Sequence, residues 1–595
     1  MKELSVAPVA VVGDETTLTD PVWQNATAAP DAVQFLRRVG GGEWQEVTCA
    51  QFRDSVTALA RGLIAAGIQP GDRVGLMSGT RYEWTLIDYA IWAAGAVTVP
   101  IYETSSPEQV AWILSDSGAV ACFVETDVHR AALAKSRHPL PGGIGPWQIE
   151  GRHSVIDDLV AEGATVAVED VERRRHDIDA DDTATIVYTS GTTGRPKGCV
   201  LTHRNLSSGI RNMLPGLRSL FGQDASTLLF LPLAHAFARI VQIGCVQARV
   251  RMGYSPGGAN LAADLKAFRP TFVLSVPRMY EKIYATAQQR ARGGIFRRAE
   301  RVAVAYSRSV DREGPGLLLR LQHALFGTLV YRRIRAALGG RCRHAICGGA
   351  PLGERLAHFY RGAGIDVREG YGLTETSPVV TFNLDDGVRI GTTGRPVPGT
   401  TVRIADDGEI LVNGPQVFAG YWNDEPATAQ CLDQDGWFRT GDLGDLDDDG
   451  FLRITGRRKD LIVTAGGKNV APDGLEDRLR AHPLVSQCVV VGDRRPFISA
   501  LVTIDEHAFA TWKARNGEPA GASVADLRAD TRLCSAVQQA VDDANETVSK
   551  AESIRAFRIL PRDFSESTGE LTATQKVRRQ VVTEEHAEEI AAMYA

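Results

Sequence analysis

Alternation of helical and strand-like patterns is the feature that most constrains the fold of this 595-residue chain. Residues 49–68 carry apolar side chains at helical spacing and end near Gly67, and residues 72–78 then form an apolar run typical of a buried strand. Residues 82–96 and 97–102 repeat this order. Further short β-rich runs lie at 119–125, 183–189 and 271–277. Such alternation predicts an α/β fold in which helices cover parallel sheets.

The pattern changes after Thr401. Residues 401–415 and 441–456 read as short strands joined by Asp/Gly turns, which favour antiparallel hairpins. From Arg457 onward helix and strand patterns alternate again. We therefore expect a large N-terminal domain, residues 1–456, of parallel-sheet subdomains with a small antiparallel β subdomain. A smaller α+β C-terminal domain, residues 457–595, would follow it.

Bulk properties exclude several classes of protein. The net charge of −6 argues against nucleic acid as a partner, because the chain has no overall positive field. Nine cysteines without disulfide or zinc spacing indicate reduced thiols and a cytoplasmic protein. The apolar run 6–12 lacks the basic lead of a signal peptide. The longest apolar run, 86–102, contains Asp88, is broken by Pro100, and falls short of the ~20 residues that span a bilayer.

One segment is strongly basic. Residues 290–335 contain eleven arginines against three acidic residues, and residues 316–331 form an apolar stripe within them. A solvated helical face is one interpretation. Peripheral contact with an anionic lipid surface, at the inner face of the membrane, is the other.

The stretch "YTSGTTGRPKG" (188–198) resembles a phosphate loop with altered positions. Counted from Gly191, a Walker A loop would place glycine where Pro196 stands and a magnesium-binding hydroxyl where Gly198 stands, while Lys197 is in register. Hydroxyls, flexible glycines and one lysine still suit a polyphosphate. A damaged nucleotide site, a different phosphate grip and a polar turn are all compatible with the loop alone. Its candidate residues are Thr189, Ser190, Gly191, Thr192, Thr193, Gly194 and Lys197.

Other polar motifs follow this loop in a fixed order. "CGGAPLG" (347–353) and "EGYGLTET" (369–376) come first, and "DGWFRTGDL" (435–443) places Asp442 after a glycine in an expected turn. "TGRRKDLIVTAGGKNVAP" (455–472) and "LTATQKVRR" (571–579) complete the series. Each motif could arise by chance. Taken alone, Glu375 could be a helix cap, Asp442 could be a turn residue and Lys576 could be a solvated lysine.

Together, in this order from Tyr188 to Arg579, the motifs resemble the adenylate-forming acyl-CoA synthetase superfamily. The segments 99–110, 230–239, 275–284 and 466–472 resemble its long-chain fatty-acid–CoA ligase branch. The resemblance implies a ligase that uses ATP, Mg²⁺ and coenzyme A. It would activate a fatty acid as acyl-AMP and then transfer the acyl group to the thiol, through donors and cations that stabilise developing negative charge.

The resemblance also implies roles for individual residues. Thr189 to Lys197 would hold the leaving β- and γ-phosphates, and Glu375 would hold Mg²⁺ in place of the missing Walker hydroxyl. Lys576 would bridge the carboxylate and the α-phosphate in the first half-reaction. The remaining nucleotide contacts would be Thr374 at the α-phosphate, Tyr371 on adenine with Gly349, Ala350 and Pro351 along its edge, and Asp442 with Arg457 on the ribose hydroxyls.

The family's C-terminal domain swings between half-reactions, which implies a mobile domain with its hinge at Lys459. Gly466 and Gly467 would then line the coenzyme A passage. His235 is either a core histidine or a gate between the acyl tunnel and the nucleotide pocket. Ala573 and Gln575 depart from the proline and the apolar residue that many relatives carry beside Lys576.

Three alternative functions stay open on sequence grounds. A fatty-acyl-AMP ligase would deliver its product to a carrier protein, and a related ligase would activate another apolar acid. A nucleotide-binding regulatory protein would not catalyse either step. The preferred chain length and the oligomeric state are not encoded in any motif that can be read directly.

Overall fold

The computed structural model describes most of the chain: residues 2–39, 43–136, 140, 144–151, 154–189, 195–290, 294–465, 468–546, 548–550, 552–572 and 575–595. The predicted phosphate-loop residues Ser190, Gly191, Thr192, Thr193 and Gly194 lie outside these ranges, and so do Gly466, Gly467 and Ala573.

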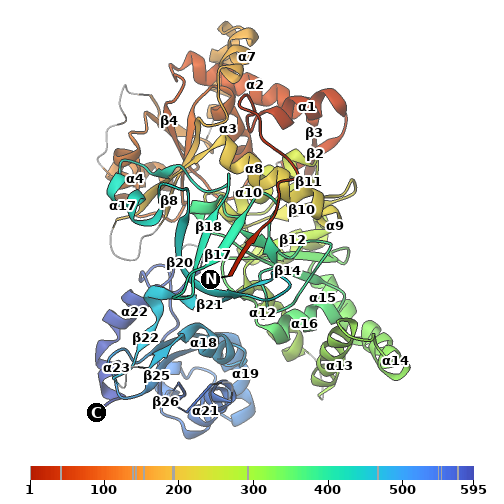
Figure 1. Cartoon of the computed structure of the whole chain (residues 1–595), viewed down its shortest axis with the longest axis vertical. Coiled ribbons are helices and arrows are strands. Elements are labelled where there is room, and N and C mark those ends of the chain that lie inside the picture. The colour runs from red at the N-terminus through yellow and green to blue at the C-terminus, as the bar shows by residue number, and fades with distance from the viewer. Residues whose placement is uncertain are drawn as a thin grey trace. The chain divides into compact units, whose positions relative to one another are not determined.

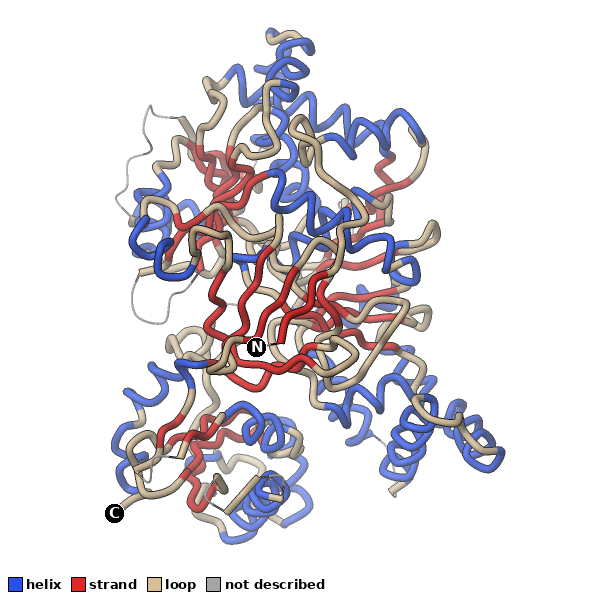
Figure 2. Tube along the Cα trace, viewed as in Figure 1, coloured by secondary structure: helices blue, strands red, loops and turns tan. Residues whose placement is uncertain are grey.

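The chain divides into two compact units (Figure 1). Unit 1 comprises residues 1–403, 411–440 and 446–452, and unit 2 comprises 404–410, 441–445 and 453–595. In Figure 2 the strands of each unit, in red, are surrounded by its helices, in blue. The α/β class is confirmed. The domain boundary at residues 456 and 457 stays a prediction.

Unit 1 holds two large sheets that are mostly parallel. The seven-stranded sheet has the order β19 (Gly420–Tyr421), β9 (Lys197–Thr202), β8 (Thr183–Thr189), β5 (Val97–Ile101), β4 (Arg73–Met77), β6 (Ala121–Val124) and β7 (Trp147–Gln148). Strands β8, β5, β4, β6 and β7 are parallel, whereas β9 and β19 are antiparallel additions at one edge.

The nine-stranded sheet has a parallel centre and antiparallel edges. Its order is β16 (Arg395–Pro396), β15 (Thr381–Phe382), β14 (Asp366–Tyr371), β13 (His344–Cys347), β12 (Phe272–Ser275), β10 (Ser226–Leu229), β11 (Arg251–Tyr254), β2 (Val33–Arg38) and β3 (Trp44–Thr48). The strands predicted at 72–78, 97–102, 119–125, 183–189 and 271–277 are confirmed as β4, β5, β6, β8 and β12.

Helices connect these strands, and their ends follow local chemistry. Helix α2 (Cys49–Ala65) begins at a capping box in which the Thr48 side chain accepts from the backbone of Gln51. Nearly all of α3 (Tyr82–Ala93) is buried, which explains why its sequence is apolar on every side. Other helices of unit 1 are α1 (Asp20–Ala28), α4 (Pro107–Ser117), α8 (His203–Met213), α10 (Ala236–Gln247), α12 (Pro277–Arg290), α13 (Ile295–Val310), α14 (Leu317–Phe326), α15 (Arg332–Ala337), α16 (Glu354–Gly362) and α17 (Glu425–Cys431).

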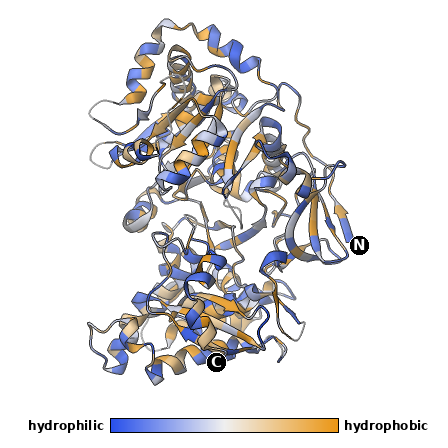
Figure 3. Ribbon diagram, turned by 90° about the vertical axis from the view of Figure 1, so that its left-hand side faces the viewer, coloured by the Kyte–Doolittle hydropathy of each residue, from blue (hydrophilic) through white to orange (hydrophobic). Residues whose placement is uncertain are grey.

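Strand interiors and the inner faces of helices together form the apolar core, and the strands are mostly orange in Figure 3. One buried cluster lies against the nine-stranded sheet and includes Tyr280, Tyr331, Phe359 and Tyr360. Another joins the seven-stranded sheet to α4 through Ile113, Leu114 and Ile186. The apolar run 86–102, considered above as a membrane segment, is the end of buried α3 followed by buried β5. No helix among the described residues has the length and apolar character needed to cross a bilayer.

The predicted hairpins after Thr401 are confirmed in a five-stranded antiparallel sheet. Its order is β1 (Lys2–Ser5), β17 (Thr401–Ile404), β18 (Glu409–Asn413), β20 (Phe438–Leu446) and β21 (Leu452–Arg457). Backbone hydrogen bonds from Ala405 to Glu409 and from Asp447 to Phe451 close its two tight turns.

The C-terminal part of unit 2 is α+β, as predicted. Its three-stranded sheet orders β24 (Val485–Val491), β25 (Ile498–Ile504) and β26 (Ile554–Ile559), and β22 (Ile462–Val463) pairs with β23 (Asn469–Val470). Buried residues of this sheet pack on α18 (Pro472–Arg480), α19 (Glu506–Asn516) and α21 (Thr531–Asn545). Helices α22 (Arg579–Glu585) and α23 (Ala587–Ala592) end the chain.

Candidate active site

The candidate phosphate loop connects two antiparallel strands. Thr189, the last residue of β8, pairs with Lys197, the first residue of β9. This pairing brings the Thr189 and Lys197 positions together where the two strands meet the loop. Lys197 is half-buried. A Walker loop instead leads directly into a helix, so this loop presents its lysine from a hairpin.

Gly198 cannot carry the hydroxyl of a Walker loop in this fold. A Cβ atom at this position would lie 2.7 Å from Cγ2 of Ile186 and 3.2 Å from side-chain atoms of Trp422 and Tyr188. The first of these distances is shorter than any ordinary carbon contact. Glycine is therefore required by packing, and the interpretation of a damaged Walker site is not needed to explain it.

The end of the loop is held by aromatic side chains. Trp112 Nε1 donates to the carbonyl oxygen of Pro196 at 2.8 Å, and the Arg195 guanidinium lies 4.6 Å from the Trp112 ring centroid. Trp422 contributes a backbone hydrogen bond from its N–H to the Gly198 oxygen at 2.7 Å. These contacts fix the direction in which Lys197 leaves the strand.

Glu375 and Lys197 share a neighbour in Tyr421. Tyr421 Oη donates to Glu375 Oε1 at 2.9 Å, and Lys197 Nζ lies 5.1 Å from the Tyr421 ring centroid. Lys197 Nζ also lies 3.8 Å from Asp424 Oδ2. Burial, together with the charge of Glu375, raises the pKa of Tyr421, so its phenol stays protonated and remains a donor. A carboxylate, a phenol and an ammonium group therefore meet beside the candidate phosphate loop.

The segment 371–377 is a tight turn that positions Glu375. Strand β14 ends at Tyr371, and a short 3₁₀ turn, η7 (Thr374–Thr376), follows it. A Cβ at Gly372 would lie 1.9 Å from the Pro378 oxygen, so only glycine allows the backbone at position 372 to lie this close to Pro378. The Thr376 hydroxyl accepts from the Leu373 N–H at 2.9 Å. Tyr371, Thr374 and Glu375 are all half-buried at this turn.

The glycine pair at 348–349 lies at the carboxyl end of the neighbouring strand, β13. A Cβ at Gly348 would lie 2.6 Å from Cζ of Phe237, and Gly349 has a φ of +83°, which favours glycine. Glu369 holds the far end of this loop by accepting from the Leu352 N–H at 2.7 Å. Gly349, Ala350 and Pro351 are exposed.

His235 lies two residues before Phe237, whose ring packs against Gly348 of this loop. Its Nδ1 accepts from the Phe237 N–H at 3.1 Å and so caps the first turn of α10. The cap requires a lone pair on Nδ1, which fixes the tautomer with hydrogen on Nε2. His235 is half-buried, so the structure gives it a local structural role and leaves the acyl gate a prediction.

Asp442 and Arg457 form an ion pair in unit 2. Arg457 Nε lies 3.0 Å from Asp442 Oδ1, and the Asp442 side chain is only 4% exposed. The sequence suggested a turn at this position, but Asp442 lies inside β20. Gly441 supplies the local irregularity with a φ of +71°, and its N–H donates to the buried Glu409 carboxylate at 3.1 Å. The alternative that Asp442 merely shapes an Asp/Gly turn is therefore wrong.

Lys576 lies on a small hairpin. Its N–H donates to Thr572 Oγ1 at 3.0 Å, its carbonyl accepts from the Thr572 N–H at 2.8 Å, and Leu571 pairs with Val577. Gln575 has a φ of +62°, an uncommon value for a residue with a side chain. An unbranched glutamine tolerates this φ better than a β-branched residue would.

The environment of Lys576 shifts its titration. Its side chain reaches solvent, but surrounding protein atoms displace much of the water near the ammonium group and lower its pKa to about 8. The charges of Arg457 and Lys459 act in the same direction, and Asp442 opposes them. Four predicted residues of unit 2 therefore lie within electrostatic reach of one another.

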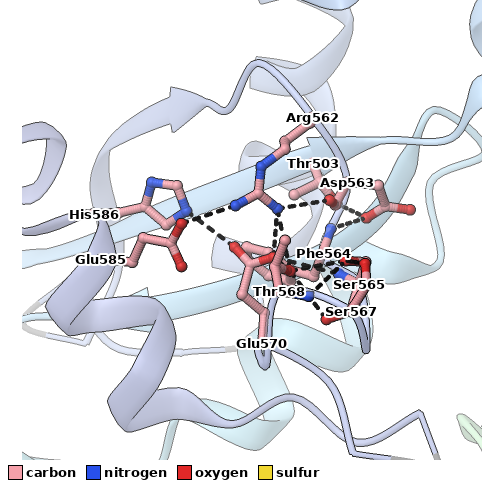
Figure 4. Close-up of polar contacts among 10 residues, drawn as sticks. All are labelled: Thr503, Arg562, Asp563, Phe564, Ser565, Ser567, Thr568, Glu570, Glu585 and His586. Atoms are coloured by element: carbon pink, nitrogen blue, oxygen red, sulfur yellow. Dashed lines mark hydrogen bonds and ion pairs between the residues drawn. The ribbon is translucent and has the colours of Figure 1, made fainter. Parts of the chain in front are cut away.

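A network of polar side chains lies at the base of the hairpin that carries Lys576 (Figure 4). Glu570, which is fully buried, accepts hydrogen bonds from Arg562 and from Thr568 Oγ1, and His586 Nε2 lies 3.3 Å from its Oε1. The Glu570 backbone oxygen accepts from the Arg578 N–H at 2.7 Å, directly across the hairpin. The base of the hairpin is thus fixed by a buried carboxylate only six positions before Lys576.

The structure thus brings the described candidates together in two groups. Unit 1 holds Thr189, Lys197, His235, the 349–351 edge, Tyr371, Thr374 and Glu375, and unit 2 holds Asp442, Arg457, Lys459 and Lys576. Sequence reasoning missed Tyr421 and Glu570. Tyr421 reaches Glu375 only because β19 pairs with β9, and spacing along the chain gives no signal of that pairing. Glu570 immediately precedes the quoted segment 571–579, and nothing in the sequence singled it out from the acidic residues around it.

Comparisons with known proteins agree with these observations. A family model described as AMP-binding enzyme matches residues 22–422, and one described as AMP-binding enzyme C-terminal domain matches residues 459–595. The long-chain-fatty-acid–CoA ligases FadD15 of Mycobacterium bovis and of Mycobacterium tuberculosis are each 52% identical to this chain, over 100% of both sequences. The ATP-bound structure of MatB from Rhodopseudomonas palustris superposes with a TM-score of 0.71 at 24% identity. It covers 96% of this chain and 100% of its own.

The likeness to MatB establishes the fold, and the family models together with the full-length relatives go further. The two models cover the segments that contain Lys197, Glu375 and Lys576, and the FadD15 relatives align over the whole chain. The resemblance drawn from those motifs is confirmed: this chain belongs to the AMP-binding enzyme family, the adenylate-forming ligases.

Proposed function

We propose that this protein is a long-chain fatty-acid–CoA ligase. A carboxylate oxygen of the fatty acid attacks the α-phosphorus of ATP, and the bond to the β-phosphate breaks to release pyrophosphate. The thiol of coenzyme A then attacks the acyl carbon of acyl-AMP. The carbon–oxygen bond to AMP breaks, and the thiol proton passes to solvent. The observation that carries this proposal is the convergence of Lys197, Glu375 and Tyr421 beside a hairpin phosphate loop.

Unit 1 supplies the phosphate and adenine contacts of the first half-reaction. Lys197 and the hydroxyls of the loop, beginning with Thr189, bind the β- and γ-phosphates and stabilise the charge of the leaving pyrophosphate. Tyr371 stacks on adenine while the 349–351 edge borders the base. Thr374 donates to the α-phosphate. Support comes from the exposed 349–351 backbone and the half-buried Tyr371, since both leave a surface that a nucleotide can reach.

The residues present are suited to Mg²⁺. Mg²⁺ in nucleotide sites takes one or two protein carboxylates and completes its shell with phosphate oxygens and water. Glu375 supplies a carboxylate whose position is set by the Tyr421 phenol. No cluster of three or more potential metal-ligating side chains exists in the described part of the chain, so a metal held by Glu375 and the phosphates is the arrangement that fits. Bound there, Mg²⁺ would neutralise charge on the phosphates.

Unit 2 supplies the ribose contacts and the catalytic cation. Asp442 accepts hydrogen bonds from the ribose hydroxyls, and Arg457 reinforces it. Lys576 bridges the attacking carboxylate and the α-phosphate. The C-terminal domain, residues 457–595, turns about Lys459 between half-reactions and brings Gly466 and Gly467 to the pantetheine arm. The electrostatic proximity of Lys576 to Asp442 supports a role for both in the same half-reaction.

The substrate is an apolar acid with a long chain, because the full-length relatives carry that specificity in their names. We place the protein in the cytoplasm, with peripheral contact at the inner face of the membrane. Transfer to a carrier protein, or use of another apolar acid, would retain the adenylation step and change only the acceptor or the tunnel.

The test combines two assays on the purified chain. ATP–pyrophosphate exchange with a panel of acids from short to very long chain reports adenylation, and CoA-dependent thioester formation reports the second step. We expect exchange and thioester with long-chain acids. Exchange without thioester would indicate a carrier-protein acceptor, and no exchange with any acid would refute adenylation itself.

Lys576→Ala tests the division of labour. It should abolish acyl-AMP formation and still convert supplied acyl-AMP to thioester. Equal loss of both half-reactions would contradict the two-conformation mechanism.

A further inference from the structure

Helix α14 presents leucine side chains to solvent. Leu317, Leu318, Leu321 and Leu325 are 80%, 70%, 69% and 58% exposed, and Leu329, in the π-helical turn that follows (Gly327–Tyr331), is 50% exposed. Their spacing places them along one side of the helix. A water-soluble surface helix normally turns such a stripe toward the core. This helix therefore carries an apolar surface that no described part of the chain covers.

The outward direction of these leucines is set by contacts on the opposite side of the helix. His323 stacks on Tyr306 of α13 with ring centroids 3.8 Å apart, and its Nε2 lies 2.6 Å from the Gly362 oxygen. Tyr331 Oη donates to the Ala299 oxygen at 2.7 Å. Because α14 is fixed to α13 through its polar and aromatic side, its leucines cannot reach the core without breaking these bonds. The two helices are the outermost pair at the lower right of unit 1 in Figure 1.

Positive charge lies on α13, the helix against which α14 packs. Arg301 and Arg308 of α13 and Arg312 of the following turn line an open hollow together with Arg355. Arg355 is already paired with Glu300. The side chains of the other three are exposed and make no hydrogen bond or ion pair with any residue that the structure describes. The carboxylates of the hollow are Glu300 and Glu313, so its balance is positive.

We propose that α14 and these three arginines form a docking surface for an anionic lipid bilayer. Leucines along one side of a helix, with unpaired arginines on the helix packed against it, are features of a surface that lies in a membrane interface. Phosphate headgroups complement unpaired guanidinium groups, and acyl chains complement the leucines. A second copy of this chain is the other occupant that would cover the leucines, and sedimentation distinguishes it from a bilayer.

This surface deepens the proposed function, since a long-chain fatty acid partitions into the same bilayer. Docking and catalysis remain separable. Neither α14 nor the three arginines belong to the residues placed in the two half-reactions. Adenylation of a short, water-soluble acid therefore reports the catalytic machinery without any membrane, and vesicle binding reports the surface without any substrate.

Flotation of the full chain with vesicles tests the proposal. We compare phosphatidylcholine vesicles with vesicles that also contain phosphatidylglycerol. One variant combines Leu318→Gln, Leu321→Gln and Leu325→Gln, which keeps helix propensity. A second combines Arg301→Gln, Arg308→Gln and Arg312→Gln. The control is Val128→Gln, which changes a side chain that is 76% exposed on α5 (Asp127–Lys135).

We expect the unmodified chain and the Val128 control to float with anionic vesicles and to bind neutral vesicles at least ~10-fold more weakly. Each combined variant should lower the partition coefficient on anionic vesicles by at least ~10-fold, with an unchanged melting temperature and unchanged activity on a short acid. Equal binding of both variants and the control would overturn the proposal. So would a leucine variant that converts a dimer to a monomer in sedimentation without any change in vesicle binding, because the occupant would then be a second copy.

Discussion

Breaking the buried ion pair between α3 and α10 should destabilise unit 1 by several kcal/mol. Asp88 is fully buried and Arg239 is 2% exposed. Arg239 Nε donates to Asp88 Oδ2 at 2.9 Å, its second guanidinium nitrogen contacts Oδ1, and a third donates to Thr185 Oγ1 at 2.6 Å. The rings of Trp84 and Trp92 lie 5.4 Å and 5.0 Å from the guanidinium carbon.

Asp88→Asn removes the negative charge and keeps the volume. Loss of one partner of a buried pair destabilises proteins by about 3–5 kcal/mol, because the other charge stays buried and uncompensated. Arg239 would retain Thr185 and two aromatic faces, and each face stabilises a cation by about 0.5–2 kcal/mol. We therefore expect the lower end of the range, about 3 kcal/mol. That is a large part of the ~5–15 kcal/mol that stabilises a typical protein.

Urea unfolding followed by tryptophan fluorescence measures this loss. With an m-value near 3 kcal/mol per M, a loss of about 3 kcal/mol lowers the midpoint by about 1 M. The matched control is Asp14→Asn, which removes a carboxylate that is 91% exposed and lies 2.8 Å from Arg204. Surface pairs contribute only about 0–1 kcal/mol, and Arg204 keeps Asp181, so this midpoint should hardly move.

A double variant separates charge from packing. Asp88→Leu combined with Arg239→Met leaves no buried charge, and Thr185 still donates to the Thr98 oxygen at 2.7 Å. This variant should be more stable than Asp88→Asn alone. The reasoning would be refuted if Asp88→Asn lost less than about 1 kcal/mol, as a surface pair does. It would also be refuted if the apolar double variant proved the less stable of the two.

Three further outcomes concern the second unit. With its pKa lowered to about 8, Lys576 is a cation below that pH, so kcat/KM for acyl-AMP formation should fall as pH rises through about 8. Lys576→Arg should remove this decline if it retains measurable activity, and an unchanged profile would contradict the assignment. Asp442→Asn should raise the ATP KM by roughly 10–100-fold, since a charged hydrogen bond contributes about 1.5–3 kcal/mol, and isothermal titration with ATP gives an independent value. Glu570→Gln should lower the unfolding free energy of unit 2 by about 1–3 kcal/mol. It should also slow adenylation while sparing thioester formation from supplied acyl-AMP. Equal slowing of both steps would show that Glu570 does not act through Lys576.

Local patterns predicted the elements of the fold well. The helix at 49–68, the strand at 183–189 and the hairpins after Thr401 all occur as expected, because hydrophobic spacing and turn residues act over a few positions. The turn expected at Asp442 does not occur. A glycine beside an aspartate is the same local signal in a turn and in an irregular strand, and only pairing with neighbouring strands distinguishes them.

Partners distant in sequence could not be predicted. Asp88 was visible only as an interruption of an apolar run, and its partner is 151 positions away. Tyr421 is 46 positions from Glu375, and no spacing rule joins them. The basic excess at 290–335 was plain in the sequence, but the outward direction of the leucines depends on how His323 packs on Tyr306.

The sequence by itself determined the class of the fold and the family chemistry. Alternating elements favour parallel sheets, and the ordered motifs of glycine, hydroxyl, carboxylate and lysine identify the chemistry through their resemblance to adenylate-forming ligases. Only the tertiary structure decided why Gly198 replaces a hydroxyl, that Tyr421 contacts both Glu375 and Lys197, and which charge compensates Arg239. The physical reason is that sterics and charge compensation depend on distances in space, and those are set by strand pairing and helix packing across the whole unit.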